Sequence, residues 1–519
     1  MHLSQKNKHY IFVFIIILFT CSIATSIQAQ NLRNKFDSFF CEINKDENIN
    51  GSVYIAENGN LVYQQSFGNA DEEHKIANTT STLFQIASVS KIFTAVAVLQ
   101  LYEQKKIKLT DKFVDYFPAF PYANVTIQQI LSNTSGIANT GDFLRNYWRM
   151  NRDTVFTLDD IIPALKASNT PLDFEPGEGW EYSNTNYNLL ALLTEKVSHE
   201  AFNNYISNHI FKPAGMESTF LKTPGSNPYH QANVAYNYAS PFLFSLPVRV
   251  DSFAIPYFKI EYRTIPDFGA AGIYSSVTDL ASFHDALNRG KLLKPSSLDL
   301  LYSASVKNNG KKIILGGVGS EAGEIGDFYW GFGNRIYLDS SMGKIIWESG
   351  GMPGCNANIV YNLNKHQLLI WLNNKESATT MNNIFEALNI LNNKPFIVKK
   401  AKKHAANIYG NLLLEQGDDK AFASLINMKS DTANYIVDED ELNQLGYDFS
   451  ENNLNTLALT TFRTAILLFP NSDNLLNSYA EVLLKAGKKE EAIIMYKESL
   501  LLNPDNEDSI KALQKLEEK

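Results

Sequence analysis

The chain has 519 residues, of which 45% are hydrophobic and 19% are charged, an ordinary balance for globular protein that excludes wholesale disorder. This length exceeds what one hydrophobic core usually organises, so we expect two or three domains. The formal net charge is −9, and an acidic surface argues against nucleic acid as the main partner.

The N-terminus has the features of an export signal. Lys6 and Lys8 precede an apolar run at residues 10–19, and small and polar residues then lead to Ala29. We therefore predict a signal peptide over residues 1–29, cleaved near Ala29, and a protein that is periplasmic or secreted. Cleavage would remove two lysines and no acid, which changes the net charge of −9 to −11.

Two other readings of this terminus fit less well. A membrane anchor is disfavoured because about 10 strongly apolar residues span a bilayer poorly. A lipoprotein would need Cys21 as its modified residue, but the threonine before it suits that processing poorly.

The remaining Cys41 and Cys355 would lie in an oxidising compartment, where it stays open whether they pair. Two distant cysteines make no disulfide framework.

The elements up to the middle of the chain mix helix and strand. Helical periodicity predicts a helix at residues 31–43, and β-rich runs around Asn58-Gly59 predict a hairpin at residues 51–65. An apolar helix is expected from Ser88 to about Gln104.

The later elements are mainly strands. A helix is expected after Ser276, capped by Ser276 and Asp279. Strands are expected at residues 328–338, 344–348, 357–362 and 367–373, before a helix at 381–391. Together with the early hairpin, they predict an α+β domain with an antiparallel sheet and flanking helices over residues 30–395.

Residues 396–519 follow a helical repeat pattern. Pro470 and Pro504 are 34 residues apart, which is the tetratricopeptide period. We predict an all-α domain with repeats at about 439–472 and 473–506, preceded by a helix pair and closed by a polar capping helix. The packing positions of the first repeat are Leu442, Leu445, Gly446, Phe449, Ala458, Phe462 and Ala465. Such a domain is expected to dock a protein partner or to brace the rest of the chain.

The candidate nucleophile is Ser88, which stands three residues before Lys91 at the start of the apolar helix. Residues three apart share a helix face, so the lysine amine can approach the serine hydroxyl and activate it. Alone this S-x-x-K spacing is weak, because chance supplies it in a chain of this length.

Two further segments bear on Ser88. Tyr182-Ser183-Asn184 follows a Pro-Gly turn and precedes a helical run, so its phenol could serve as a base in a cleft. Glu348-Ser349-Gly350-Gly351 ends a strand, where glycines allow close approach and a backbone N–H could complete an oxyanion site. Taken singly, a core tyrosine and a plain glycine turn explain these segments better.

Together these motifs resemble the serine beta-lactamases and penicillin-binding-protein-like hydrolases of the class C type, over about residues 40–390. The matching segments are Ser88–Lys91, Leu131–Gly136, Tyr182–Asn184, Gly272–Leu280 and Gly350–Gly354. The resemblance implies an acyl-enzyme on Ser88, with Lys91 tuning the hydroxyl, Tyr182 moving the proton and Asn184 binding Lys91 and the substrate amide. It also implies an oxyanion hole from the backbone of Ser88 and Gly351, a substrate site that includes Glu348, Ser349 and Gly350, and no metal or organic cofactor.

One position departs from the family pattern. Glu348 stands where Lys or His is common, and a carboxylate there would repel an anionic substrate. This weakens the case for penicillins and D-Ala-D-Ala peptides and fits a neutral ester, an amine-bearing substrate or a changed site better. Cys355 also stands where an aromatic residue is frequent. The substrate therefore stays open among a beta-lactam, a D-amino-acid peptide and an ester.

The runner-up function is a binding or scaffold protein with an altered site that acts through its repeats. The intact set of four site residues favours an enzyme instead. A zinc helix is excluded because His199-Glu200 is followed by Asn203 rather than histidine at the required position. No G-x-S-x-G elbow is present, which disfavours an α/β-hydrolase. Substrate, docked partner and oligomeric state do not follow from the sequence.

Overall fold

The computed structural model describes residues 30–45, 49–141, 143, 156–252, 268–320, 323–377 and 379–517. The chain divides into two compact units. The first holds the chain up to Tyr238 together with Arg249–Lys400, and the second holds Ala239–Val248 and Ala401–Lys519. The boundary at residue 400 lies close to the predicted one, but the place of residues 239–248 in the second unit was not predicted. The predicted signal peptide lies outside the described residues, within which no helix is long and apolar enough to cross a membrane.

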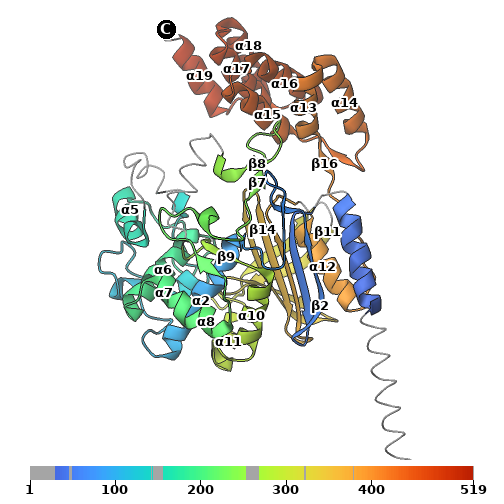
Figure 1. Cartoon of the computed structure of the whole chain (residues 1–519). Helices are drawn as coiled ribbons and strands as arrows, with labels where there is room; N and C mark the ends of the chain where they lie inside the picture. Colours follow the sequence, from blue (N-terminus) through green and yellow to red (C-terminus); the bar gives the residue numbers. More distant parts are fainter. Residues whose placement is uncertain are drawn as a thin grey trace, which may run out of the picture. The chain divides into compact units, whose positions relative to one another are not determined.

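The first unit is built on an eight-stranded antiparallel sheet (Figure 1). Its strand order is β10-β11-β12-β13-β14-β15-β1-β2, so the first hairpin of the unit pairs with its last strand. The strands are β1 (Gly51–Glu57), β2 (Asn60–Phe67), β10 (Ile314–Ser320), β11 (Gly323–Trp330), β12 (Arg335–Asp339), β13 (Gly343–Met352), β14 (Cys355–Asn362) and β15 (Gln367–Asn373). This arrangement confirms the predicted α+β class.

Helices cover both faces of this sheet. Alternate residues of a strand point to opposite faces, and in β13 Trp347 packs with α12 (Thr380–Leu391) and the helix at residues 30–45. Ile346 packs on the other face, with α2 (Ser90–Glu103), α6 (Asn184–Ser198) and α10 (Val277–Asn288). Because both faces are covered, the central strands read as continuous apolar runs; every residue of β15 is buried.

The remaining elements of this region are short. They are β3 (Asn69–Asp71), β4 (Ile76–Ala77), β5 (Phe84–Gln85), η1 (Ala87–Val89), η2 (Phe113–Asp115), α3 (Ile127–Leu131), η3 (Leu158–Asp160), α5 (Ile161–Ser168), α7 (Phe202–Ile206), η4 (Ser207–Phe211), α8 (Lys212–Ala214), β6 (Phe220–Leu221), η5 (Pro228–His230), β7 (Tyr238–Ala239), β8 (Val248–Arg249), η6 (Val250–Ser252), β9 (Ile273–Ser275) and α11 (Pro295–Leu301). Of these, β5, β9 and β6 form a small sheet that leads into η1.

Two local predictions are corrected. The strand expected at residues 328–338 is two antiparallel strands, β11 and β12, because Gly333 takes a φ of +80° and turns the chain back. Ser276 does cap α10 by accepting from the N–H of Asp279 at 3.1 Å. Asp279 does not complete a reciprocal cap; its Oδ2 accepts from the backbone N–H of Thr219 at 2.8 Å instead.

The second unit is a row of helices: α13 (Ala405–Gln416), α14 (Asp418–Ser430), α15 (Glu439–Glu451), α16 (Asn455–Leu468), α17 (Asp473–Lys485), α18 (Lys489–Leu502) and α19 (Glu507–Glu517). A short parallel pair, β16 (Lys403–His404) and β17 (Tyr435–Ile436), accompanies the first of them. The helix pair before the two predicted repeats is confirmed as α13 and α14. All seven predicted packing positions of the first repeat are buried, while the assignment of these pairs to the tetratricopeptide family stays a prediction.

Gly446 shows why a small residue is needed where α15 and α16 meet. A Cβ at this position would lie 2.5 Å from Cε2 of the Phe462 ring, and that ring is completely buried. We expect Gly446→Val to lower the free energy of unfolding of the second unit by about 2 kcal/mol through overpacking.

Calorimetry of the full chain measures this change. Leu467→Ala is the matched control, because Leu467 is 71% exposed and its truncation should change stability by about 0.5 kcal/mol or less. Unchanged stability of Gly446→Val would contradict the packing described.

Candidate active site

Ser88 lies in the one-turn 3₁₀ helix η1, which leads directly into α2. The preceding Ala87 has a φ of +44°, a left-handed conformation that residues with a Cβ rarely adopt. Strain of this kind persists only where the surrounding structure enforces it. The serine is therefore presented by a fixed turn one step before the helix in which it was predicted.

Lys91 lies in the first turn of α2 and is 1% exposed. Its Nζ donates to Ser88 Oγ at 3.1 Å, to Asn184 Oδ1 at 2.7 Å and to the carbonyl oxygen of Ala270 at 3.0 Å. An ammonium has three N–H bonds, so these three acceptors satisfy it completely. The buried charge is thus compensated, and one of its bonds is to the candidate nucleophile.

Tyr182 contacts the same serine from a second direction. Its Oη lies 2.9 Å from Ser88 Oγ, and its ring stands edge-on to Trp330 with centroids 5.7 Å apart. Lys91 Nζ lies 4.8 Å from the centroid of the tyrosine ring. The structure therefore brings together the four residues predicted from the motifs: Ser88, Lys91, Tyr182 and Asn184.

The start of α6 is held by the polar segment that follows α3. Asn184 donates its backbone N–H to Asn139 Oδ1 at 3.0 Å. Two residues further, Asn186 donates to Asn133 Oδ1 and accepts from Ser135 Oγ, both at 2.7 Å. Because these side chains are buried, their bonds fix the helix end that carries Asn184. The segment Leu131–Gly136, one of the segments that match the family, thus positions the site.

Strand β13 passes directly against the Ser88 turn. A Cβ on Gly350 would lie 2.3 Å from the carbonyl oxygen of Ile86 and 2.7 Å from the backbone nitrogen of Ser88. Only glycine permits this approach. Gly351 follows and is exposed. Its predicted role, donation from the backbone N–H in an oxyanion hole, is therefore not sterically blocked.

Glu348 is buried, which the sequence did not indicate. Its side chain and that of His284 on α10 are each 1% exposed, with Glu348 Oε2 3.4 Å from His284 Nε2. Within the described part of the chain, neither carboxylate oxygen has a hydrogen-bond partner. The expected repulsion of an anionic substrate stays a prediction, and the structure adds that this carboxylate lies beside His284.

Arg335 on β12 is the site residue that motif reasoning missed. Its Nη1 donates to Ser349 Oγ at 2.5 Å, and its guanidinium lies over the Trp347 ring at 4.7 Å. Burial lowers the pKa of Arg335, and the nearby Tyr182 opposes that shift. No motif contains this arginine; only the pairing of β12 with β13 shows that it lies beside Ser349.

Cys355 helps to fix the segment before the Ser88 turn. Its Sγ donates to the carbonyl oxygen of Gln85 at 2.8 Å, and Gln85 Nε2 donates to Met352 Sδ at 3.1 Å. Burial raises the pKa of the Cys355 thiol to about 12. Cys41 is exposed, and both cysteines are free.

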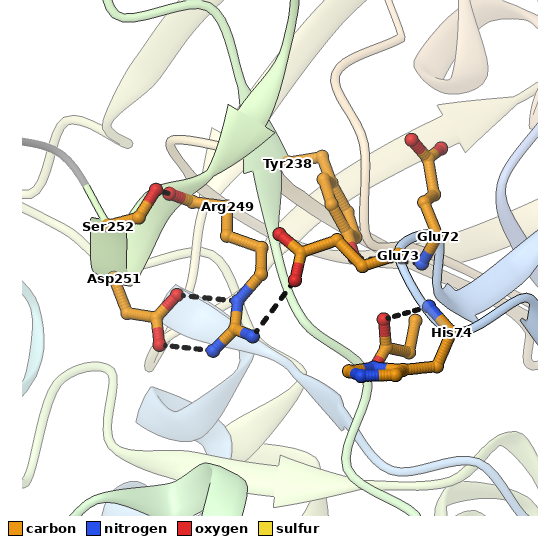
Figure 2. Close-up of polar contacts among 8 residues, drawn as sticks. Glu72, Glu73, His74, Tyr238, Arg249, Asp251 and Ser252 are labelled. Carbon is orange, nitrogen blue, oxygen red and sulfur yellow. Dashed lines mark hydrogen bonds and ion pairs between the residues drawn. The ribbon is translucent and has the colours of Figure 1, made fainter.

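One group of described residues could offer ligands to a metal ion: Asp71, Glu73 and His74, whose ligand atoms lie within 4.8 Å of one another. His74 Nδ1 already lies 2.7 Å from Asp71 Oδ2, and Glu73 lies 3.6 Å from Arg249 (Figure 2). These contacts account for the group without an ion, so we assign no metal to it.

The sheet with helices on both faces, and a serine contacted by a lysine and a tyrosine at its edge, define a class of serine hydrolases. Residues 36–385 match the Beta-lactamase family, and the chain belongs to this family.

Individual relatives agree with this membership. Penicillin-binding protein 4* of Bacillus subtilis is 31% identical over 401 residues, which cover 75% of this chain and 84% of the relative. A penicillin-binding protein from Bacillus halodurans has a similar structure, with a TM-score of 0.53 and 23% identity over 66% of this chain and 97% of that one. The D-amino acid amidase of Ochrobactrum anthropi has a TM-score of 0.53 and 20% identity, over 70% of this chain and 98% of its own.

The buried pair of Glu348 and His284 yields a prediction about stability. His284→Ala should destabilise the first unit by about 3 kcal/mol, because it leaves a buried carboxylate without its partner. The double variant His284→Leu, Glu348→Leu should recover much of this loss, since it removes both polar groups. Urea unfolding followed by tryptophan fluorescence measures both; a double variant less stable than His284→Ala would contradict the pairing.

Proposed function

We propose that this chain is an exported serine hydrolase that cleaves an amide bond through an acyl-enzyme on Ser88. The observation that carries the proposal is the double contact of Ser88 Oγ, with Lys91 Nζ at 3.1 Å and Tyr182 Oη at 2.9 Å. A serine hydroxyl becomes an effective nucleophile when a base lies within this distance. The features of residues 1–29 support export.

The proposed reaction has two halves. Tyr182 accepts the Ser88 proton as Oγ attacks the carbonyl carbon, and it returns that proton to the leaving nitrogen as the C–N bond breaks. Lys91 stabilises negative charge that develops on Ser88 Oγ, to which its Nζ donates. Water then attacks the acyl ester, its proton passes through Tyr182 to Ser88 Oγ, and the acid is released. Backbone N–H groups of Ser88 and Gly351 are the proposed donors to the carbonyl oxygen.

The arrangement of charges favours a substrate with a carboxylate beside the scissile bond. Arg335 and Ser349 lie in direct contact on neighbouring strands, and a guanidinium with a hydroxyl forms a good carboxylate site. Glu348 is turned to His284 and does not cancel this charge. Beta-lactams and peptides ending in a D-amino acid carry such a carboxylate, whereas a simple ester does not. The relative named as a penicillin-binding protein supports the same substrate class.

We also infer that α15–α16 and α17–α18 are tetratricopeptide repeats. Support comes from the period of 34 residues between Pro470 and Pro504 and from the packing of Gly446 against Phe462. A pure scaffold function through these repeats is disfavoured, because a decayed site would not keep four polar side chains in mutual contact.

Labelling by a penicillin or a fluorophosphonate, followed by intact mass, tests the acyl-enzyme. Wild type expressed with its own N-terminus should gain one adduct, on a chain that starts at Gln30 if the export signal is cleaved as proposed. Ser88→Ala should gain none. Equal labelling of the two proteins, or none of either by both reagents, would refute the assignment of Ser88.

Arg335 is tested with a matched pair of substrates, a peptide ending in D-Ala-D-Ala and the same peptide with a C-terminal amide. Arg335→Gln should lower kcat/KM for the acid about 30-fold, which corresponds to roughly 2 kcal/mol for a charge-assisted hydrogen bond. The amide should be hydrolysed at nearly the wild-type rate. Arg289→Gln is the control, since Arg289, directly after the end of α10, is 65% exposed. Equal losses on acid and amide would count against a carboxylate site.

A further inference from the structure

Residues 239–248 form a hairpin whose tip belongs by its packing to the second unit, although the chain on both sides belongs to the first. Its two ends, β7 and β8, pair with each other. At its tip, the chain turns between Phe242 and Ser245, whose Oγ and backbone N–H both donate to the Phe242 carbonyl oxygen. The turn presents Leu243 and Phe244 outward from the hairpin.

The second unit holds this tip by apolar and polar contacts. The rings of Phe242 and Phe244 are parallel with centroids 5.3 Å apart, and Phe244 stacks on Phe449 of α15 at 4.6 Å. Gly410 of α13 leaves room for the ring: a Cβ there would lie 3.1 Å from the Phe244 Cβ. The aromatic side chain therefore occupies a fitted place between two helices.

A buried carboxylate completes this place. Asp448 is 6% exposed, and its Oδ2 accepts from the backbone N–H of Leu243 at 2.8 Å. Its other oxygen accepts from Gln444 at 2.8 Å. A buried carboxylate without donors is costly, so Asp448 is matched to a segment that offers a free backbone N–H next to an aromatic residue.

The base of the hairpin is anchored separately in the first unit (Figure 2). Tyr238 Oη accepts from the backbone N–H of Glu72 at 2.8 Å, and Arg249 binds both oxygens of Asp251. Arg249 also lies 3.6 Å from Glu73 and stacks on the Tyr236 ring. The chain thus leaves and re-enters the first unit at two fixed points.

The base also contacts both segments that carry the candidate oxyanion N–H groups. Asn237, directly before the hairpin, donates to Gln85 Oε1 at 2.8 Å, and Gln85 stands three residues before Ser88. Gln85 in turn donates to Met352, which follows Gly351. Gly354 packs against the backbone of Tyr238 so closely that a Cβ would lie 2.6 Å from its nitrogen.

We propose that the helical unit binds the 239–248 hairpin as an intramolecular ligand, and that this binding positions Gln85 and Met352 next to the Ser88 turn and Gly351. The occupant of the Phe449–Asp448 surface is this chain's own Leu243–Phe244 turn. A protein partner that presented an aromatic residue beside a free backbone N–H would act on the hydrolase by displacing it. A test of this proposal by the labelling of Ser88 rests on the proposed function, whereas the positioning of Gln85 and Met352 does not.

Hydrogen exchange of the full chain tests the binding of the hairpin by the helical unit without any substrate. Phe244→Ala should raise exchange about fivefold or more at residues 237–239, 85–88 and 352–355, because loss of an anchor shifts the local opening equilibrium. Leu246→Ala is the matched control: Leu246 lies in the same hairpin but is 77% exposed, so this variant should exchange like wild type. Unchanged exchange in Phe244→Ala would overturn the proposal.

Two further readouts separate the possible failures. The rate of Ser88 labelling by a fluorophosphonate should fall about threefold or more in Phe244→Ala and not in Leu246→Ala. If wild type is not labelled at all, the proposed function fails, while the exchange result still decides the binding of the hairpin. Loss of exchange protection in α13 and α15 would mean that Phe244→Ala disturbs the helical unit itself. In that case Phe449→Leu is used as the test variant instead of Phe244→Ala, since it removes the ring stack but keeps an apolar side chain. Wild-type exchange at residues 85–88 in Phe449→Leu would then overturn the proposal.

Discussion

The buried ammonium of Lys91 is the interaction on which the first unit is organised. Removing a charge from water costs several kcal/mol unless partners replace the lost hydration, and the three acceptors come from the Ser88 turn, from α6 and from Ala270. The last of these segments is tied down again by Thr94, which donates to the carbonyl oxygen of Gly269 at 2.6 Å. Satisfying one charge therefore brings three distant parts of the chain to one point, and that point is where the nucleophile lies.

A second constraint is the absence of side chains where backbone must approach backbone. Gly350 lets β13 lie against the Ser88 turn, and Gly354 lets the next turn lie against Tyr238. Successive side chains of β13 point to opposite faces of the sheet. Glu348 therefore points into the interior toward His284, while Ser349 contacts Arg335. A single strand thereby separates the buried Glu348 and His284 side chains from the half-buried guanidinium of Arg335. The unusual acidic residue Glu348 is compatible with anion recognition because its side chain and that of Arg335 lie on opposite sides of β13.

The helical unit is also defined by what it binds within its own chain. Its apolar core accepts Leu243 and Phe244 as partly buried members, and Asp448 receives a backbone N–H from the same turn. Helical repeats commonly offer such surfaces to partners. Here the surface is filled by the Leu243–Phe244 turn of the same chain, with Phe244 stacked on Phe449.

The sequence by itself determined the α+β class, the hairpin at Asn58-Gly59, the helix pairs after residue 400 and the four residues around Ser88. Each of these rests on local spacing or on a motif, so no knowledge of distant contacts was needed. Only the tertiary structure decided the split of residues 328–338 into two strands, the burial of Glu348, the place of Arg335 beside Ser349, and the attachment of residues 239–248 to the second unit. These features arise from pairing between segments far apart in the chain, and neither the charge of Glu348 nor the aromatic character of Phe244 indicates which segment it will meet.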